Sequence, residues 1–70
     1  MNNDILVGVV NREKLYVKFN YDEEKIRKVK LINGRRWEPE EKYWTIPYTD
    51  ENINKVIEVF GLSAVKFHKS

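Results

Sequence analysis

The sequence predicts an α+β fold, a two-layer sandwich in which a mainly antiparallel sheet carries two helices on one face, in the order β-β-α-β-β-α-β. Segments with apolar residues at every second position surround two segments with apolar residues at helical spacing, and Gly, Pro, Asn and Asp fall between them. Each amphipathic helix needs an apolar surface, which one sheet face supplies. Seventy residues are too few for a second core, so residues 1–70 are expected to form a single small domain.

The N-terminal part is expected to form a β-hairpin. Residues 5–10 are a short apolar run rich in β-branched side chains, which is typical of a strand. Residues 11–13 supply a turn. Leu15, Val17 and Phe19 then alternate with polar and aromatic neighbours, which is the period of a strand with one buried face.

The next segment is expected to form a helix. Asn20 or Asp22 can cap its N-terminus, where the acids that follow complement the helix dipole. Asn33 and Gly34 accept a left-handed backbone, so the helix is expected to end there. Its buried stripe is predicted to be Ile26, Val29 and Ile32.

A second hairpin is predicted after this helix. Residues 35–37 and 42–46 are the expected strands, and the acidic, proline-containing residues 38–41 form the turn between them. Pro47 closes the second strand because it has no backbone donor.

A second helix and a last strand complete the fold. Thr49 is the expected N-cap and Gly61 the expected end. Residues 62–70 alternate again and are expected to add a short strand through Val65 and Phe67. The helical spacing is carried by Ile53, Val56, Ile57 and Phe60.

Positive charge is concentrated between Lys25 and Trp37. This segment holds six cations and no acid, whereas residues 22–24 and 38–41 hold six of the eleven acids, and the net charge is only +2. Clustered cations suit a polyanion such as a phosphate backbone. The alternative is a solvated helix face whose cations pair with Glu side chains one turn earlier.

Between Lys14 and Phe60, about two-thirds of the chain, the sequence resembles known DNA-binding modules. The matching segments are Leu15-Tyr-Val-Lys-Phe, Tyr21-Asp-Glu-Glu-Lys-Ile, Lys30, Gly34-Arg-Arg-Trp37 and Lys42-Tyr-Trp44-Thr-Ile-Pro47. They resemble the HARP-type module of annealing helicases and are also similar to the small N-terminal domain of some Xer-like tyrosine recombinases and phage integrases. The resemblance implies binding to branched or forked DNA in the first case and to recombination-site DNA in the second. The contacts it implies are Lys30, Arg35, Arg36 and Lys42.

We therefore expect a non-catalytic DNA-binding accessory module of a DNA-processing protein, either a recombinase or integrase or an annealing helicase. It would grip the phosphate backbone of duplex or branched DNA through a cationic helix and the adjoining hairpin. The alternative is a protein-interaction domain that docks onto other domains of a larger enzyme without contacting nucleic acid. The expected nucleic-acid-binding residues are Lys28, Lys30, Arg35, Arg36, Lys42 and Tyr43.

The two tryptophans are open to a functional and a structural interpretation. Exposed rings could stack on bases, whereas buried rings would stabilise a domain of this size. Trp44 shares strand parity with Ile46, so we expect it in the core, and we expect Trp37 there too. Tyr16 and Tyr43 have the opposite parity and are the expected exposed rings.

Catalysis is not expected from this chain. It has no cysteine, and its one histidine, His68, lies close to the C-terminus, so no nucleophile and base pair is evident. No cofactor or metal is predicted, because capping and turn roles explain the acidic clusters. No apolar run of about 18 residues and no signal peptide pattern is present, which predicts a cytoplasmic monomer of a prokaryote or phage without membrane attachment.

Overall fold

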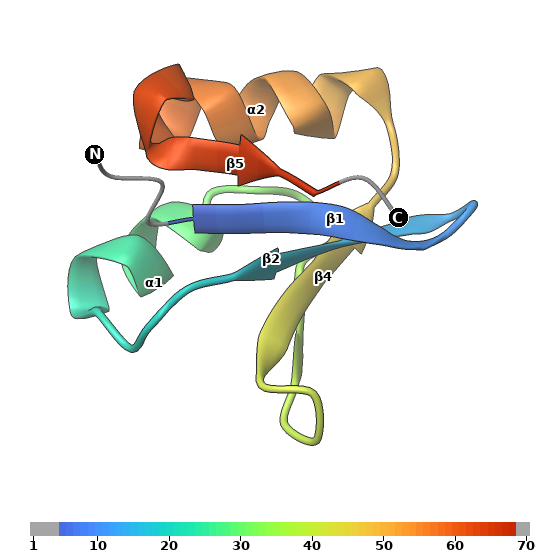
Figure 1. Cartoon of the computed structure of the whole chain (residues 1–70), viewed down its shortest axis with the longest axis horizontal. Coiled ribbons are helices and arrows are strands. Elements are labelled where there is room, and N and C mark those ends of the chain that lie inside the picture. The colour runs from blue at the N-terminus through green and yellow to red at the C-terminus, as the bar shows by residue number, and fades with distance from the viewer. Residues whose placement is uncertain (1–4, 69–70) are drawn as a thin grey trace.

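A five-stranded sheet forms one layer of the protein and two helices form the other (Figure 1). The structure is a computed structural model that describes residues 5–68. The strand order is β3-β4-β2-β1-β5, with β5 parallel to β1 and every other neighbouring pair antiparallel, so the predicted α+β class and element order are confirmed. The elements are β1 (Ile5–Asn11), β2 (Lys14–Lys18), α1 (Glu23–Val29), β3 (Arg36–Glu38), β4 (Tyr43–Pro47), α2 (Asp50–Phe60), a 3₁₀ turn (Leu62–Ala64) and β5 (Val65–Phe67).

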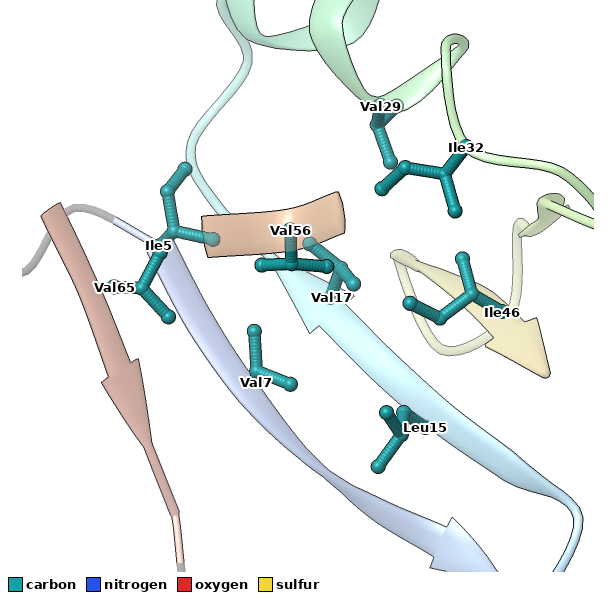
Figure 2. Packing of buried hydrophobic residues seen from close by; sticks show 9 residues of the cluster. All are labelled: Ile5, Val7, Leu15, Val17, Val29, Ile32, Ile46, Val56 and Val65. Atoms are coloured by element: carbon teal, nitrogen blue, oxygen red, sulfur yellow. The ribbon is translucent and has the colours of Figure 1, made fainter. Parts of the chain in front are cut away.

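The core lies between the helices and one face of the sheet. Val7 pairs with Val17, and Leu15 pairs with Ile46, which places these side chains on the same sheet face. Figure 2 shows side chains from both helices in the same cluster, so both helices cover that face. The buried side chains of the core are Ile5, Val7, Leu15, Val17, Val29, Ile32, Ile46, Val56 and Val65.

Helix α1 is shorter than the sequence predicts. Asp22 rather than Asn20 caps it, accepting hydrogen bonds from the backbone N–H groups of residues 24 and 25. The helix ends at Val29, and the chain tightens into i to i+3 bonds, including one of 3.1 Å from the Ile32 N–H to the Val29 carbonyl. Ile32 is fully buried from this turn, so the predicted helix through residues 33–34 is wrong although the predicted burial is right.

Gly34 fixes where the chain turns back toward the sheet. Its φ is +81°, and an added Cβ would lie 2.6 Å from Cγ of Pro47. A side chain would therefore meet both backbone strain and a collision with β4. This close approach holds the segment before β3 against the end of β4.

The second hairpin differs from the prediction by one residue at each turn boundary. Strand β3 begins at Arg36 and includes Glu38, which leaves Arg35 outside the strand. Lys42 also lies outside, in the turn, with φ of 61° and its N–H bonded to the Glu38 carbonyl at 2.8 Å. Tyr43 begins β4, and Pro47 ends it as expected.

The predicted ends of α2 are confirmed. Thr49 caps it through a 3.1 Å bond from the N–H of residue 52, and Gly61 is the C-cap. The last strand is shorter than predicted, because residues 62–64 form a 3₁₀ turn, and residues 69 and 70 lie outside the described residues. No helix within residues 5–68 is long and apolar enough to cross a membrane.

Helix α2 carries a buried polar side chain, Asn52, that no sequence pattern indicated. Asn52 is only 8% exposed, and its side-chain amide donates to the Pro47 carbonyl at 3.0 Å and to the Asn33 carbonyl at 3.5 Å. These bonds connect three segments, namely α2, the end of β4 and the loop after α1. Asn52 therefore fixes the start of the second hairpin.

Candidate nucleic-acid interface

The sheet face opposite the helices carries most of the positive charge contributed by the strands. Strand register places alternate residues of all five strands on this open face. Glu38 is the one acid at these strand positions, and its carboxylate lies 3.4 Å from Nε of Arg36. The strand positions of the open face therefore carry net positive charge. Its strand cations are Lys14, Lys18, Arg36 and Lys66.

A stacked pair of tyrosines lies at the centre of the open face. The rings of Tyr16 and Tyr43 are 5.0 Å apart between centroids and inclined by 14°. Gly8 pairs with Tyr16 in register, and a Cβ at Gly8 would collide with the Tyr16 ring, so the missing side chain lets that ring lie on β1. Desolvation, together with the nearby Glu41 and Glu38 carboxylates and the Tyr16 hydroxyl, raises the pKa of the Tyr43 hydroxyl above its ordinary value. The Tyr43 hydroxyl therefore stays neutral at physiological pH.

The tyrosine rings are less exposed than the sequence suggested. Their strand parity is as predicted, but Tyr16 and Tyr43 are both only partly exposed. The reason is that each ring covers the other and Tyr16 also covers Gly8.

A groove of about 760 Å³ lies on the opposite side of the β3–β4 hairpin, beside α1. Figure 1 shows the hairpin extending away from both helices, which leaves this side of its strands uncovered. In the part of the chain that the structure describes, three lysines and no acid line the groove. Its lysines are Lys18, Lys30 and Lys42, and its main apolar and aromatic walls are Phe19, Tyr21, Ile26, Trp37, Pro39 and Trp44.

Trp37 is not a core residue, so the expectation that it would be buried is wrong. It pairs with Trp44 across the hairpin, with ring centroids 5.3 Å apart and planes inclined by 56°. Trp37 is 46% exposed because β3 is the edge strand and no helix covers it, whereas Trp44, one strand further in, is partly buried against the core. The exposed part of the Trp37 ring belongs to the groove wall.

Four of the six binding residues predicted from the sequence lie on the open face or in the groove beside α1. Lys30 and Lys42 line the groove, and Arg36 lies on the open face. Tyr43 has its ring in the tyrosine stack and also borders the groove. The remaining two lie apart from these surfaces. Lys28 lies on α1 with its Nζ 3.8 Å from a Glu24 carboxylate oxygen, and Arg35 is exposed in the loop before β3.

Several residues of the open face were not identified from the sequence. Lys14 and Lys18 flank Tyr16 at alternate positions of β2, and Lys66 is at the equivalent place on β5. The signal that could have found the first two is the pattern Lys-x-Tyr-x-Lys on the polar side of an amphipathic strand.

A second, smaller groove of about 400 Å³ lies on the helix-covered side of the sheet, at its other end. Val9, Tyr48 and Phe67 contribute to it and are each just over 40% exposed. Among residues 5–68, no lysine lines this groove, and it is the apolar surface best suited to contact with another protein.

Comparison with known protein families, curated proteins and solved structures finds no match to this chain. Within residues 5–68, no group of three or more His, Cys, Asp or Glu side chains is placed to hold a metal ion. We therefore infer function from the geometry and charge of the open face and of the groove beside α1.

Proposed function

We propose that this chain is a non-catalytic DNA-binding module of a DNA-processing protein, and that it binds the phosphate backbone with the open face of its sheet. The observation that carries the proposal is the presence of four strand cations and one acid around a stacked tyrosine pair. The hairpin predicted from the sequence remains part of this interface through Arg36 and Tyr43. The sheet, rather than α1, supplies its other cations.

A sheet face suits this role because its side chains project from a rigid backbone. Lys14 and Lys18 are four residues apart on β2, which corresponds to about 13 Å. Arg36 pairs with Glu38 on the exposed surface, where such an ion pair contributes at most about 1 kcal/mol. A phosphate can therefore replace that carboxylate at low cost, and the guanidinium can bind it in a bidentate manner.

Two double variants with the same change in net charge test the location of the interface. Lys14→Gln with Arg36→Gln removes two open-face cations, and Arg27→Gln with Lys28→Gln removes two cations of α1. Four phosphate contacts by the wild type give a slope of roughly −3.6 for log affinity against log salt on duplex DNA. We expect the open-face variant to flatten this slope by about 1.8 and the helix variant to leave it nearly unchanged, as measured by fluorescence anisotropy at several salt concentrations.

Because both double variants lose two positive charges, a difference between their DNA affinities reports on where the charges lie. An equal effect of the two double variants would mean that only net charge matters. A larger effect of the helix variant would return the interface to the cationic helix predicted from the sequence. Circular dichroism of both variants checks that the fold is retained.

The alternative function is docking onto another protein domain, favoured by the apolar groove at Val9, Tyr48 and Phe67. Binding at such a surface is expected to change little with salt, whereas phosphate binding weakens steeply. A wild-type protein that shows no salt-dependent binding to duplex, forked or single-stranded DNA would leave docking as the better account.

A further inference from the structure

We propose that the groove between α1 and the β3–β4 hairpin accepts one unpaired DNA base, which stacks on Trp37 while its phosphates contact the lysines of the groove. This inference rests on the proposed DNA binding and assigns a second subsite to it, which shares Lys18 with the open face. The open face would bind backbone of any sequence, and the groove would select DNA that presents an unpaired nucleotide.

The walls of the groove provide a stacking surface. Trp37 is 46% exposed, and its ring is supported by Trp44 at a centroid distance of 5.3 Å. Tyr21 is 79% exposed and also lines the groove. A base that stacks on one aromatic ring gains a contact that does not depend on its identity. The volume of about 760 Å³ falls within the range of sites that hold small organic groups.

The charge of the groove determines which occupant fits. Among the described residues, the charged side chains that line it are all lysines, namely Lys18, Lys30 and Lys42. An apolar peptide would use the aromatic walls but would leave the ammonium groups without partners. A nucleotide combines a planar ring with an anion, so it matches both features of the groove.

Lys42 is held in the groove by an uncommon backbone conformation. Its φ of 61° lies in the left-handed region, which Gly and Asn adopt more readily than Lys. Strained residues of this kind concentrate at functional sites. A glycine at this position would suit the turn better, so the presence of a lysine in a groove of matching charge supports a role for its side chain.

The test compares a perfect DNA duplex with the same duplex carrying one bulged thymidine, using the whole chain and fluorescence anisotropy. A bulged base is already unpaired, so its entry into the groove requires no broken base pair. We expect the wild type to bind the bulged duplex about tenfold more tightly, which corresponds to one stacked base. We expect Trp37→Ala to lose this preference while it still binds the perfect duplex, and Trp37→Phe to keep most of it.

A second pair of variants tests Lys42 separately from folding. Lys42→Gly removes the side chain and relieves the left-handed backbone, so we expect weaker binding of the bulged duplex but an unchanged or higher melting temperature. Lys42→Arg keeps the charge and is expected to bind nearly as the wild type does. Loss of both affinity and melting temperature in Lys42→Gly would show a structural role instead and contradict the assignment.

The outcomes separate this inference from the proposed function. Equal affinity of the wild type for both duplexes, or a bulge preference that survives Trp37→Ala, would overturn the groove assignment and leave backbone binding intact. Absence of any DNA binding would overturn both. Tighter binding of oligouridine than of oligothymidine, lost in Trp37→Ala, would keep the groove as a base site but contradict the assignment to DNA.

Discussion

Replacing Trp44 with alanine is expected to lower the free energy of unfolding by about 3 kcal/mol, at the lower end of the range for such truncations because the ring is only partly buried. Trp44 pairs with Val17 across the sheet, so its ring lies on the core side between β3 and the central strand. A chain of this length is stable by only roughly 4–10 kcal/mol in total, so the loss is a large fraction. Urea unfolding followed by far-ultraviolet circular dichroism measures it.

Trp37→Ala is the matched control for this prediction. The two rings face the same side of neighbouring strands and contact each other, but Trp37 is 46% exposed. Its removal is expected to cost about 1 kcal/mol, mostly from the lost ring pair. Similar destabilisation by both variants would mean that Trp37 supports the core as much as Trp44 does. The Trp37 ring would then not be free to stack on a base in the groove.

Asn52→Asp is expected to destabilise the protein by about 3 kcal/mol at neutral pH. The substitution keeps the shape of the side chain but replaces its amide donor with a carboxylate that can only accept hydrogen bonds. That carboxylate would be buried facing the carbonyl oxygens of Pro47 and Asn33, which now receive the amide hydrogens. The loop before β3 would also lose the hydrogen bond that connects it to α2.

The effect of Asn52→Asp is also expected to depend on pH. Burial and the two facing carbonyls raise the pKa of the introduced carboxyl in the folded state above its unfolded value of about 3.9. A group with a raised folded pKa favours folding at low pH and opposes it as pH rises through that pKa. The difference in stability from the wild type should therefore grow from pH 4 to pH 7, as chemical unfolding at each pH can measure.

Asn54→Asp is the control for the Asn52 variant, because Asn54 is exposed on the same helix and its substitution makes the same change in charge. It is expected to change stability by less than about 0.5 kcal/mol. Equal stability losses in the two variants would contradict the claim that the buried amide links α2 to the hairpin.

The β3–β4 hairpin contributes to both proposed subsites. Arg36 and the Tyr43 ring lie on its open face, while Trp37 faces the groove and Lys42 lines it from the turn. Since successive residues of a strand point to opposite sides, one short hairpin can place backbone contacts on one side and a base site on the other. Its position depends on the Asn52 bonds and on the close contact of Gly34 with Pro47.

Features that depend on local periodicity and capping could be predicted from the amino-acid sequence. Alternation identified the buried face of β2 through Leu15 and Val17, and Asp22, Thr49 and Gly61 marked helix ends as the structure has them. These features follow from backbone geometry and from hydrogen bonds within a few residues, so neighbouring residues are enough to predict them. The same reasoning predicted the burial of Ile32, although it misjudged the local conformation.

Which strand faces are covered depends instead on how the strands and helices pack together. The large apolar surface of Trp37 favoured a core position, but its exposure depends on β3 being the edge strand and on the helices covering only the inner strands. Likewise, adjacency in the sequence grouped Arg35 and Arg36 with Lys30, whereas strand pairing sends Arg36 to the open face and brings Lys14, Lys18 and Lys66 there from distant segments. Which side chains are covered, and which charges lie together, depends on which segments pair across the sheet. No local sequence pattern encodes that pairing.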